Sequence, residues 1–226
     1  MTRKAVVTGL GATTPIGGTV PELWRNALAG VSGVSAIDAE WLELYPTSSR
    51  IAASVSTPAS EALSRVEAKR LDPSGQLSLI SAREAWADAG FSGADAELSD
   101  EVDPERLAVV FGTGIGGAWT LLDAWDTMRE RGVRRVMPMT VPMLMPNGNS
   151  ATIGMALKAR AAAITSVSAC ASGTESLDLA LQLIRSGKAD IVMTGSTEAA
   201  IHPLPIGAFC AMQAMSKRND DPQAAS

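Results

Sequence analysis

The stretch from residue 162 to residue 187 constrains the fold of this chain more than any other. A β-forming run at residues 162–167 ends in small residues, and a helical pattern begins directly after Cys170. Apolar residues at 4- and 3-residue spacing mark one face of that helix: Leu177, Leu181 and Ile184. Gly187 stands where a glycine commonly ends a helix. The pattern therefore predicts a strand, a sharp turn and a helix, with a cysteine on the turn.

A cysteine on such a turn is suited to nucleophilic chemistry. The unpaired N–H groups and the positive dipole end at the start of a helix favour a thiolate over a thiol. The neighbours of Cys170 are all small, which leaves room for a substrate carbonyl: Ala169, Ala171, Ser172 and Gly173. The alternative is a buried structural cysteine, because free cysteine is among the most buried residue types. Position and small neighbours alone leave both interpretations open.

Apolar β-forming runs alternate with helical patterns along the chain, which is typical of a parallel sheet covered by helices. Strands are expected at residues 5–8, 107–111, 162–167 and 191–194. A first helix is expected from Thr19, where Glu22 completes a Thr-x-x-Glu capping box. Further helices are expected at residues 73–89 and from Gly117 to Gly132. Two segments lack a clean pattern, the polar residues 91–104, which indicate a surface loop, and residues 136–149.

Composition excludes several classes of protein. The chain has 226 residues, 46% of them hydrophobic, which suits one large domain or two small ones with a sizeable core. A net charge of −5, without a basic stripe, argues against a nucleic-acid partner. Two distant cysteines form no disulfide framework and indicate the cytoplasm, and a single histidine leaves little to build a zinc site. No apolar run approaches the ~20 residues of a membrane span, and no secretion signal is evident.

The loop at residues 112–117 matches the pattern G-x-G-x-x-G and lies between an expected strand and an expected helix. A dinucleotide site must therefore be considered. Such a site requires an acidic residue at the end of the next strand. The next β-like run, residues 134–138, is basic and is broken by proline, and a strand and two helices precede the loop. These features disfavour nucleotide binding.

The motif around Cys170, residues 167–173, resembles the nucleophile motif of the β-ketoacyl-acyl-carrier-protein synthases, a family of the thiolase superfamily. Other segments follow in the order of that family: residues 6–9, 112–117, 141–147, 189–190, 195, 198–199 and 215–220. The similarity covers nearly the whole chain and is strongest to the elongating synthases of actinobacterial type. The resemblance implies an α/β fold with thiolase-like αβαβα layers. That fold has two similar halves, and residues 1–226 resemble only the N-terminal one, so we expect a truncated or incomplete sequence.

The resemblance also implies a reaction. Cys170 would take an acyl chain from the phosphopantetheine of an acyl carrier protein as a thioester, and decarboxylating malonyl-carrier would then extend it by two carbons. Two histidines and a lysine for this step come from the second half of the family's fold. No metal or redox cofactor is implied. The family also implies a homodimer, in which residues 162–167 of two copies pair near a two-fold axis.

Several further residues acquire expected roles through the same resemblance. Ile115 would narrow the mouth of the acyl pocket, and Phe209 would form part of the pocket wall. Four basic residues match positions near the pocket entrance, where an acidic carrier protein docks: Lys69, Arg70, Arg134 and Arg135. Cys210 has no matching role and indicates a small buried side chain.

Four alternatives remain open. A thiolase or an initiating synthase shares the fold, and a polyketide synthase shares the chemistry. A catalytically inactive partner would resemble a chain-length factor, which lacks the nucleophilic cysteine that this chain has. A non-enzymatic scaffold is the fourth. His202 could pair with Cys170 as a dyad, but nothing in the spacing fixes their distance, so a structural or surface role is favoured.

Overall fold

The computed structural model describes residues 3–92 and 102–225. These residues form two compact units. The first unit comprises Met1–Gly11 and Ala59–Ala199, and the second comprises Ala12–Pro58 and Ala200–Ser226. Cys170 and Ile115 belong to the first unit, which also holds the three-stranded sheet.

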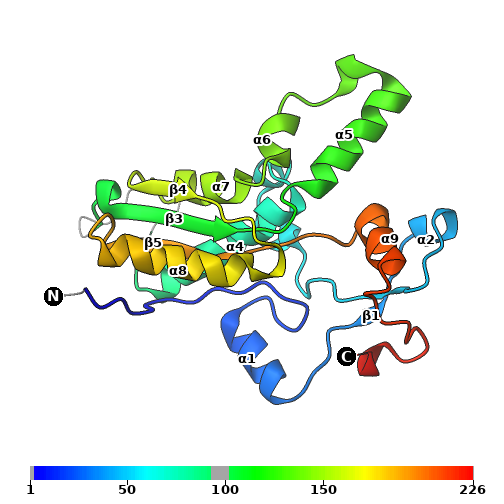
Figure 1. The fold of residues 1–226 in the computed structure, drawn as a ribbon, viewed down its shortest axis with the longest axis horizontal. Coiled ribbons are helices and arrows are strands. Elements are labelled where there is room, and N and C mark those ends of the chain that lie inside the picture. The colour runs from blue at the N-terminus through cyan, green and yellow to red at the C-terminus, as the bar shows by residue number, and fades with distance from the viewer. Residues whose placement is uncertain (1–2, 93–101, 226) are drawn as a thin grey trace. The chain divides into compact units, whose positions relative to one another are not determined.

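The sheet of the first unit consists of three parallel strands in the order β4–β3–β5 (Figure 1). Their bounds are Leu107–Gly112 for β3, Ala162–Ile164 for β4 and Ile191–Ser196 for β5. In the register, Ala108 of β3 pairs with Ala162 of β4, and Leu107 pairs with Ile191 of β5. Parallel neighbours require crossover connections. The expectation of a parallel sheet covered by helices is confirmed.

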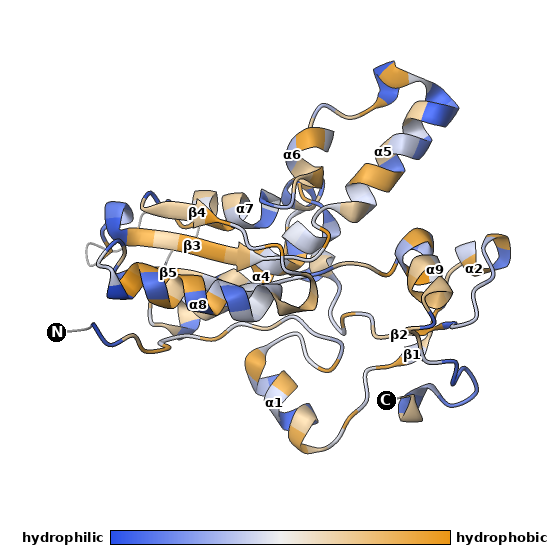
Figure 2. Cartoon of the chain, in the orientation of Figure 1, coloured by the Kyte–Doolittle hydropathy of each residue, from blue (hydrophilic) through white to orange (hydrophobic). Residues whose placement is uncertain are grey.

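Strand β3 is buried along its whole length and supplies the core on one face of the sheet. Its larger side chains pack with Trp86 of α4 (Pro73–Asp88) and with Ile153 of α7 (Gly148–Ala156). Every second residue of β3 belongs to this core, because side chains of a strand alternate between its two faces: Leu107, Val109 and Phe111. Figure 2 shows β3 as a continuous apolar strand. Full burial of each such side chain contributes about 1.5–3 kcal/mol.

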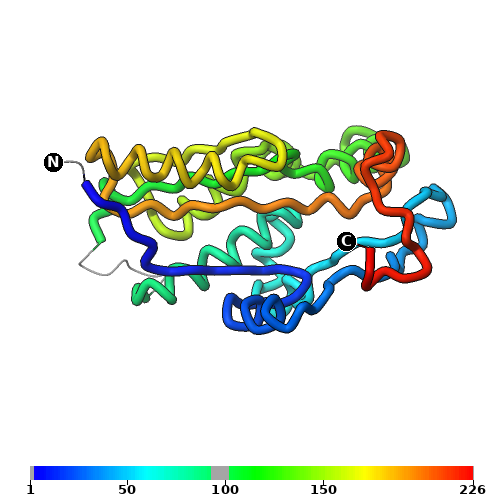
Figure 3. Tube along the Cα trace, turned by 60° about the horizontal axis from the view of Figure 1, so that its bottom comes forward, coloured from blue at the N-terminus to red at the C-terminus, as the bar shows by residue number. Residues whose placement is uncertain are grey.

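Helix α8 (Ser172–Arg185) covers the opposite face of the sheet. Figure 3 shows α8 on one side of the strands and α4 on the other. The residues that it buries are small: Ser172, Ser176 and Ala180. A Cβ on Gly112 would lie only 2.6 Å from the carbonyl oxygen of Ser172, so the helix start and the strand end are in close contact. The expected helix and its end at Gly187 (φ +75°) are confirmed. Of the expected apolar face, Leu177 is 55% exposed, whereas Leu181 and Ile184 are half-buried.

The other helices of the first unit are α3 (Arg65–Ala68), α5 (Ala118–Arg131) and α6 (Thr140–Leu144). Short 3₁₀ turns accompany them: Ala59–Glu61, Pro104–Arg106, Val133–Arg135 and Ala169–Ala171. The expected end of α5 at Gly132 is confirmed, with φ +82°. Within residues 136–149, expected to be neither clean helix nor clean strand, the structure forms α6 and the start of α7. Most of the expected loop at residues 91–104 lies outside the described residues.

The predicted strand at residues 5–8 is wrong. Val6 and Val7 are 78% and 76% exposed, and the segment belongs to no sheet ladder of the described chain. It leads instead onto α4, where a Cβ on Gly9 would lie 2.1 Å from the Ala85 carbonyl oxygen. The Leu10 N–H also donates to Asp88 at 2.8 Å. Packing on a helix leaves the backbone without the neighbouring strand that a ladder requires.

The second unit contains α1 (Val20–Leu28), α2 (Trp41–Leu44), α9 (Pro203–Ala211) and a final 3₁₀ turn, Pro222–Ala224. Its short strands β1 (Ser35–Ala36) and β2 (Ile51–Ala52) pair antiparallel. The expected helix start at Thr19 is confirmed, because its hydroxyl accepts from the Glu22 N–H at 3.5 Å. The Glu22 carboxylate in turn accepts from the N–H of Gly18 at 3.0 Å.

Candidate active site

Cys170 lies in the 3₁₀ turn that connects the end of β4 to α8, and its side chain is exposed. Its neighbour Ala169 has φ +51°, in the left-handed region that non-glycine residues seldom adopt. Such a conformation costs about 1–2 kcal/mol in an alanine. Backbone strain of this kind concentrates at functional sites, where the surrounding structure holds it in place.

Ser172 holds this turn from its inner side. The side chain is 2% exposed, and its hydroxyl oxygen accepts from the Ser168 N–H at 2.9 Å. The same hydroxyl donates toward two carbonyl oxygens, that of Ala169 at 2.7 Å and that of Thr113 at 3.1 Å. One buried serine thus connects the strained turn to the loop that follows β3.

The start of α8 carries no capping side chain, because its N-cap Ala171 makes no side-chain hydrogen bond. The N–H groups of a first helical turn have no partners within the helix, and they form a positive region directly beside Cys170. The hydroxyl of Ser168 donates to the carboxylate of Glu175, one turn into the helix. Sulfur, backbone donors and polar side chains therefore meet at one exposed turn.

The glycine loop at residues 112–117 joins β3 to α5. Its N–H groups at Gly114 and Ile115 donate to one carboxylate oxygen of Glu198, at 2.8 and 3.0 Å. The Gly116 N–H donates to the hydroxyl of Thr113 at 3.0 Å. A phosphate-binding loop offers such N–H groups to its ligand, whereas here they already bind protein oxygens. The loop geometry therefore agrees with the sequence argument against a dinucleotide site.

The structure brings the glycine loop and the cysteine turn together. The Thr113 N–H donates to the Ser166 carbonyl at 3.2 Å, and a Cβ on Gly114 would lie 3.7 Å from the Ala169 carbonyl oxygen. Ile115 is 44% exposed at the tip of this loop. Glu198 was not among the site residues predicted from the sequence. An acidic residue just beyond the end of β5, the strand beside β3, was the available signal.

Two of the sequence-derived candidates belong to the second unit. Phe209 lies on α9 and is 40% exposed. His202 is the N-cap of the same helix, and its Nδ1 accepts from the Leu204 N–H at 3.3 Å. This bond gives the histidine a structural role at a helix start. Cys210 is half-buried on α9.

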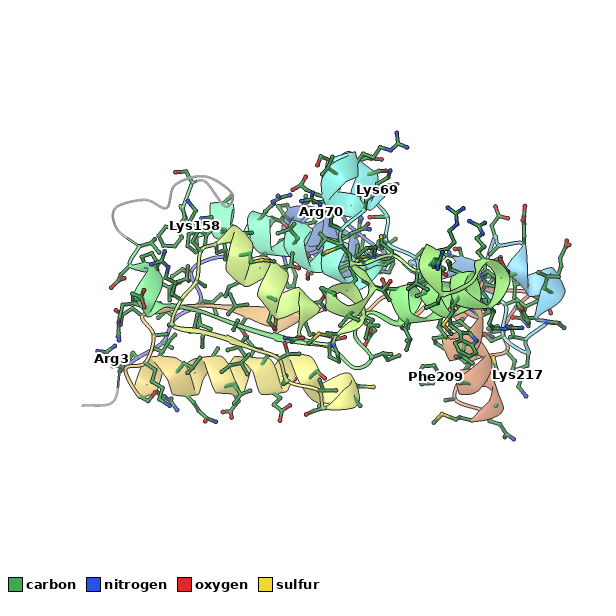
Figure 4. The ribbon with its side chains drawn as sticks, turned by 90° about the horizontal axis from the view of Figure 1, so that it is seen from above. Arg3, Lys69, Arg70, Lys158, Phe209 and Lys217 are labelled. Carbon is green, nitrogen blue, oxygen red and sulfur yellow. The ribbon has the colours of Figure 1, made fainter. Side chains whose placement is uncertain are left out.

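The four basic candidates are exposed side chains of the first unit. Lys69 and Arg70 follow the end of α3 (Figure 4), and Arg134 and Arg135 lie in the 3₁₀ turn after α5. Arg70 lines a hollow of about 480 Å³, and Arg135 lines a second one of about 270 Å³. The two hollows share Leu71 and Met143, so Arg70 and Arg135 border adjoining depressions of one surface.

Two carboxylates of the first unit have strongly altered acidity. Hydrogen bonds from Ser64 and then from Arg83 lower the pKa of Glu67 to about 2. Hydrogen bonds from Arg106 above all, and from Arg3, lower the pKa of Asp190 to about 2. Both groups serve local structure: Glu67 belongs to the capping box of α3, and Asp190 bonds Arg3 near the chain start and Arg106 before β3.

The described part of the chain holds no cluster of metal-ligating side chains. Within residues 3–92 and 102–225, no helix is long and apolar enough to cross a membrane.

Comparisons with known proteins agree with this geometry. A family model described as the N-terminal domain of β-ketoacyl synthases matches residues 2–226. The 3-oxoacyl-[acyl-carrier-protein] synthase 2 of Mycobacterium tuberculosis is 37% identical over 221 residues, 97% of this chain and 51% of that protein. The enzyme of the same name from Staphylococcus aureus is 35% identical over 219 residues, 96% of this chain and 51% of that protein.

Solved structures show the same correspondence. A β-ketoacyl synthase from Burkholderia phymatum superposes with a TM-score of 0.83 at 25% identity, over 99% of this chain and 53% of that one. A ketosynthase in complex with its type II polyketide synthase acyl-carrier protein, bound to a hexaketide, superposes with a TM-score of 0.79 at 28% identity. That match covers 96% of this chain and 50% of the other. The chain thus spans about half the length of the proteins it matches, and the expected α/β fold of an N-terminal half is confirmed.

Proposed function

This chain belongs to the β-ketoacyl synthase family, and we propose that it supplies the nucleophile-bearing half of an enzyme that elongates acyl chains on a carrier protein. The observation that carries the proposal is the exposed Cys170 on a strained turn at the uncapped start of α8. A buried structural cysteine would not have this exposure. The 37% identity to a 3-oxoacyl-[acyl-carrier-protein] synthase supports fatty-acid elongation.

In the proposed reaction, the Cys170 thiolate attacks the carbonyl carbon of an acyl thioester on carrier phosphopantetheine. The new carbon–sulfur bond forms as the bond to the carrier sulfur breaks, and the carrier leaves as a thiolate that takes up the proton Cys170 lost on ionising. Backbone N–H groups at the turn stabilise the oxyanion. Malonyl-carrier then loses carbon dioxide, and the resulting carbanion attacks the acyl carbonyl and releases Cys170. The resemblance assigns decarboxylation to two histidines in the second half of the family's fold.

The resemblance to the family also supports assignments for the substrate and partner sites. We assign Ile115 to the mouth of the acyl pocket and Phe209 to its wall. The four exposed basic residues Lys69, Arg70, Arg134 and Arg135 would dock the acidic carrier protein, and a cationic patch offsets the repulsion expected from the chain's net charge of −5. A homodimer would form along the edge strand β4, whose Ala163 and Ile164 are exposed in the described chain.

Acylation of the complete natural protein that contains residues 1–226 tests this proposal. After incubation with an acyl-carrier thioester, the peptide that contains Cys170 should gain one acyl mass. The gain should vanish in Cys170→Ala and persist in Cys210→Ala, the matched control at the second free cysteine. Acylation that survives Cys170→Ala would contradict the assignment.

A polyketide ketosynthase is the second candidate, favoured by the 28% identity to the ketosynthase of the polyketide complex. Both enzymes acylate the same cysteine, so substrate choice separates them. Transfer of saturated long-chain acyl groups supports fatty-acid elongation, and preferred transfer of poly-β-keto chains supports the alternative.

A further inference from the structure

Glu198 makes an unusual set of contacts for an exposed carboxylate. One of its oxygens, Oε2, accepts two consecutive backbone N–H groups, from Gly114 at 2.8 Å and from Ile115 at 3.0 Å. The hydroxyl of Thr113 lies 3.4 Å from each carboxylate oxygen. Consecutive N–H groups that converge on one anion form a concave anion-binding site, and charged acceptors make such bonds stronger. Here the protein itself provides the anion.

The rest of the loop is fixed by other contacts. Thr113 is 1% exposed, its N–H donates to the Ser166 carbonyl at 3.2 Å, and its hydroxyl accepts from the Gly116 N–H at 3.0 Å. The backbone of Thr113 is thus anchored to the core by a bond that does not involve Glu198, and Gly116 is held to Thr113. The two residues at the tip, Gly114 and Ile115, depend on Glu198 for the bonds of their N–H groups.

We propose that Glu198 is a positioning residue that holds the tip of the glycine loop, and with it the side chain of Ile115, beside the Cys170 turn. The tether itself follows from the hydrogen bonds, whereas its consequence for substrate choice rests on the proposed function of Ile115. Loss of the tether releases the tip while the anchored backbone of Thr113 stays in place. Ile115 then no longer defines one pocket mouth, and discrimination by acyl-chain length declines.

Three variants probe the tether from both sides. Glu198→Ala removes the acceptor. Glu198→Gln keeps an oxygen that can accept both N–H groups, so it is the conservative rescue. Gly114→Ala places a Cβ 2.9 Å from Glu198 Oε2 and displaces the mobile end of that side chain. The matched glycine control is Gly154→Ala, whose Cβ would meet neighbouring side chains only at 3.8 and 3.9 Å.

Hydrogen exchange on the complete protein measures whether the two tip amides are hydrogen-bonded, without any assumption about activity. In Glu198→Ala and Gly114→Ala, the amides of Gly114 and Ile115 should exchange roughly ten- to hundredfold faster, the factor expected for losing a bond to a charged acceptor. Gly154→Ala should exchange near the wild-type rate, Glu198→Gln should lie between wild type and Glu198→Ala because its acceptor is neutral, and the β3 amides should keep their protection in all variants. Unchanged exchange at both tip amides in Glu198→Ala would overturn the proposal.

Acyl transfer to Cys170 measures the consequence of the tether for discrimination by acyl-chain length. The ratio of long-chain to short-chain transfer should change in Glu198→Ala, and the added effect of Ile115→Phe on that ratio should be smaller in this background than in wild type. Equal losses for both lengths, with Ile115→Phe fully effective, would show that Glu198 does not position Ile115. If wild type itself is never acylated at Cys170, the proposed function fails, while the exchange measurement still decides the tether.

Discussion

Replacing Ser172 with alanine tests whether the buried face of α8 holds the cysteine turn. The substitution removes one oxygen from a site that is 2% exposed. The Ser168 N–H then loses its acceptor at 2.9 Å, and the Ala169 and Thr113 carbonyls lose their shared donor. A buried polar group left without a partner costs about 1–3 kcal/mol.

We therefore expect Ser172→Ala to lower the free energy of unfolding by about 2 kcal/mol. For a chain of this size, that change lowers Tm by about 4–8 °C. The strained φ of Ala169 also loses its support, so the turn relaxes and Cys170 no longer keeps one position. Misplacement of a reacting atom lowers rates steeply, and acylation of Cys170 should slow by about tenfold or more.

The matched control is Ser176→Ala, one turn further along the same buried face. The Ser176 hydroxyl bonds the Ser172 carbonyl at 2.8 Å and the Ser166 hydroxyl at 2.9 Å. Ser166 keeps the Ser172 carbonyl as a second partner at 2.9 Å, so this variant should cost less than about 1 kcal/mol. Thermal melts and timed acylation of both variants provide the comparison. Equal losses of stability and of acylation rate would refute the argument.

Three further predictions address the pocket, the acid limit of stability and the docking surface. Ile115→Phe should reduce transfer of long acyl chains far more than short ones, because each CH₂ that loses its place costs about 0.8 kcal/mol; equal losses would assign Ile115 to the fold. The Asp190 pKa of about 2 lies below its ordinary value of 3.8, so its contribution to stability is complete above that value and is lost as pH falls from about 4 to 2. Asp190→Asn should therefore flatten the acid limb of a stability–pH curve, and an unchanged limb would contradict this. Charge reversal of Lys69 and Arg70 should weaken carrier binding most at low salt, whereas Lys158→Glu should not. Binding titrations at two ionic strengths check this, and equal effects of the two changes would contradict the surface assignment.

Features specified by local chemistry could be predicted from the sequence. The cap at Thr19, the glycine ends of α5 and α8, and the apolar runs of β3 and β5 depend on residues within a few positions of one another. The cysteine turn was predictable for the same reason, since its strand and its helix are adjacent in sequence. The φ of Ala169 was not, because alanine itself disfavours that conformation.

Features that depend on contacts between distant segments could not be predicted from the sequence. Val6 and Val7 have strand-like side chains, but a strand needs a partner, and this segment leads onto α4 instead. The contact of Glu198 with Gly114 joins positions 84 residues apart. No periodicity within either segment reports it. The roles of Phe209 and of the basic residues likewise depend on partners, so they remain proposals.

The small residues on the inner face of α8 explain why the fully buried positions of this helix are not its large apolar ones. Ser172 contacts the end of β3 so closely that a Cβ on Gly112 would lie 2.6 Å from its carbonyl oxygen. A leucine on that face would force the helix away from the strand and separate the cysteine turn from the glycine loop. Leu177 instead lies on the outer side and is 55% exposed. The close approach of the cysteine turn to the glycine loop therefore requires small residues where a stable core alone would favour large ones.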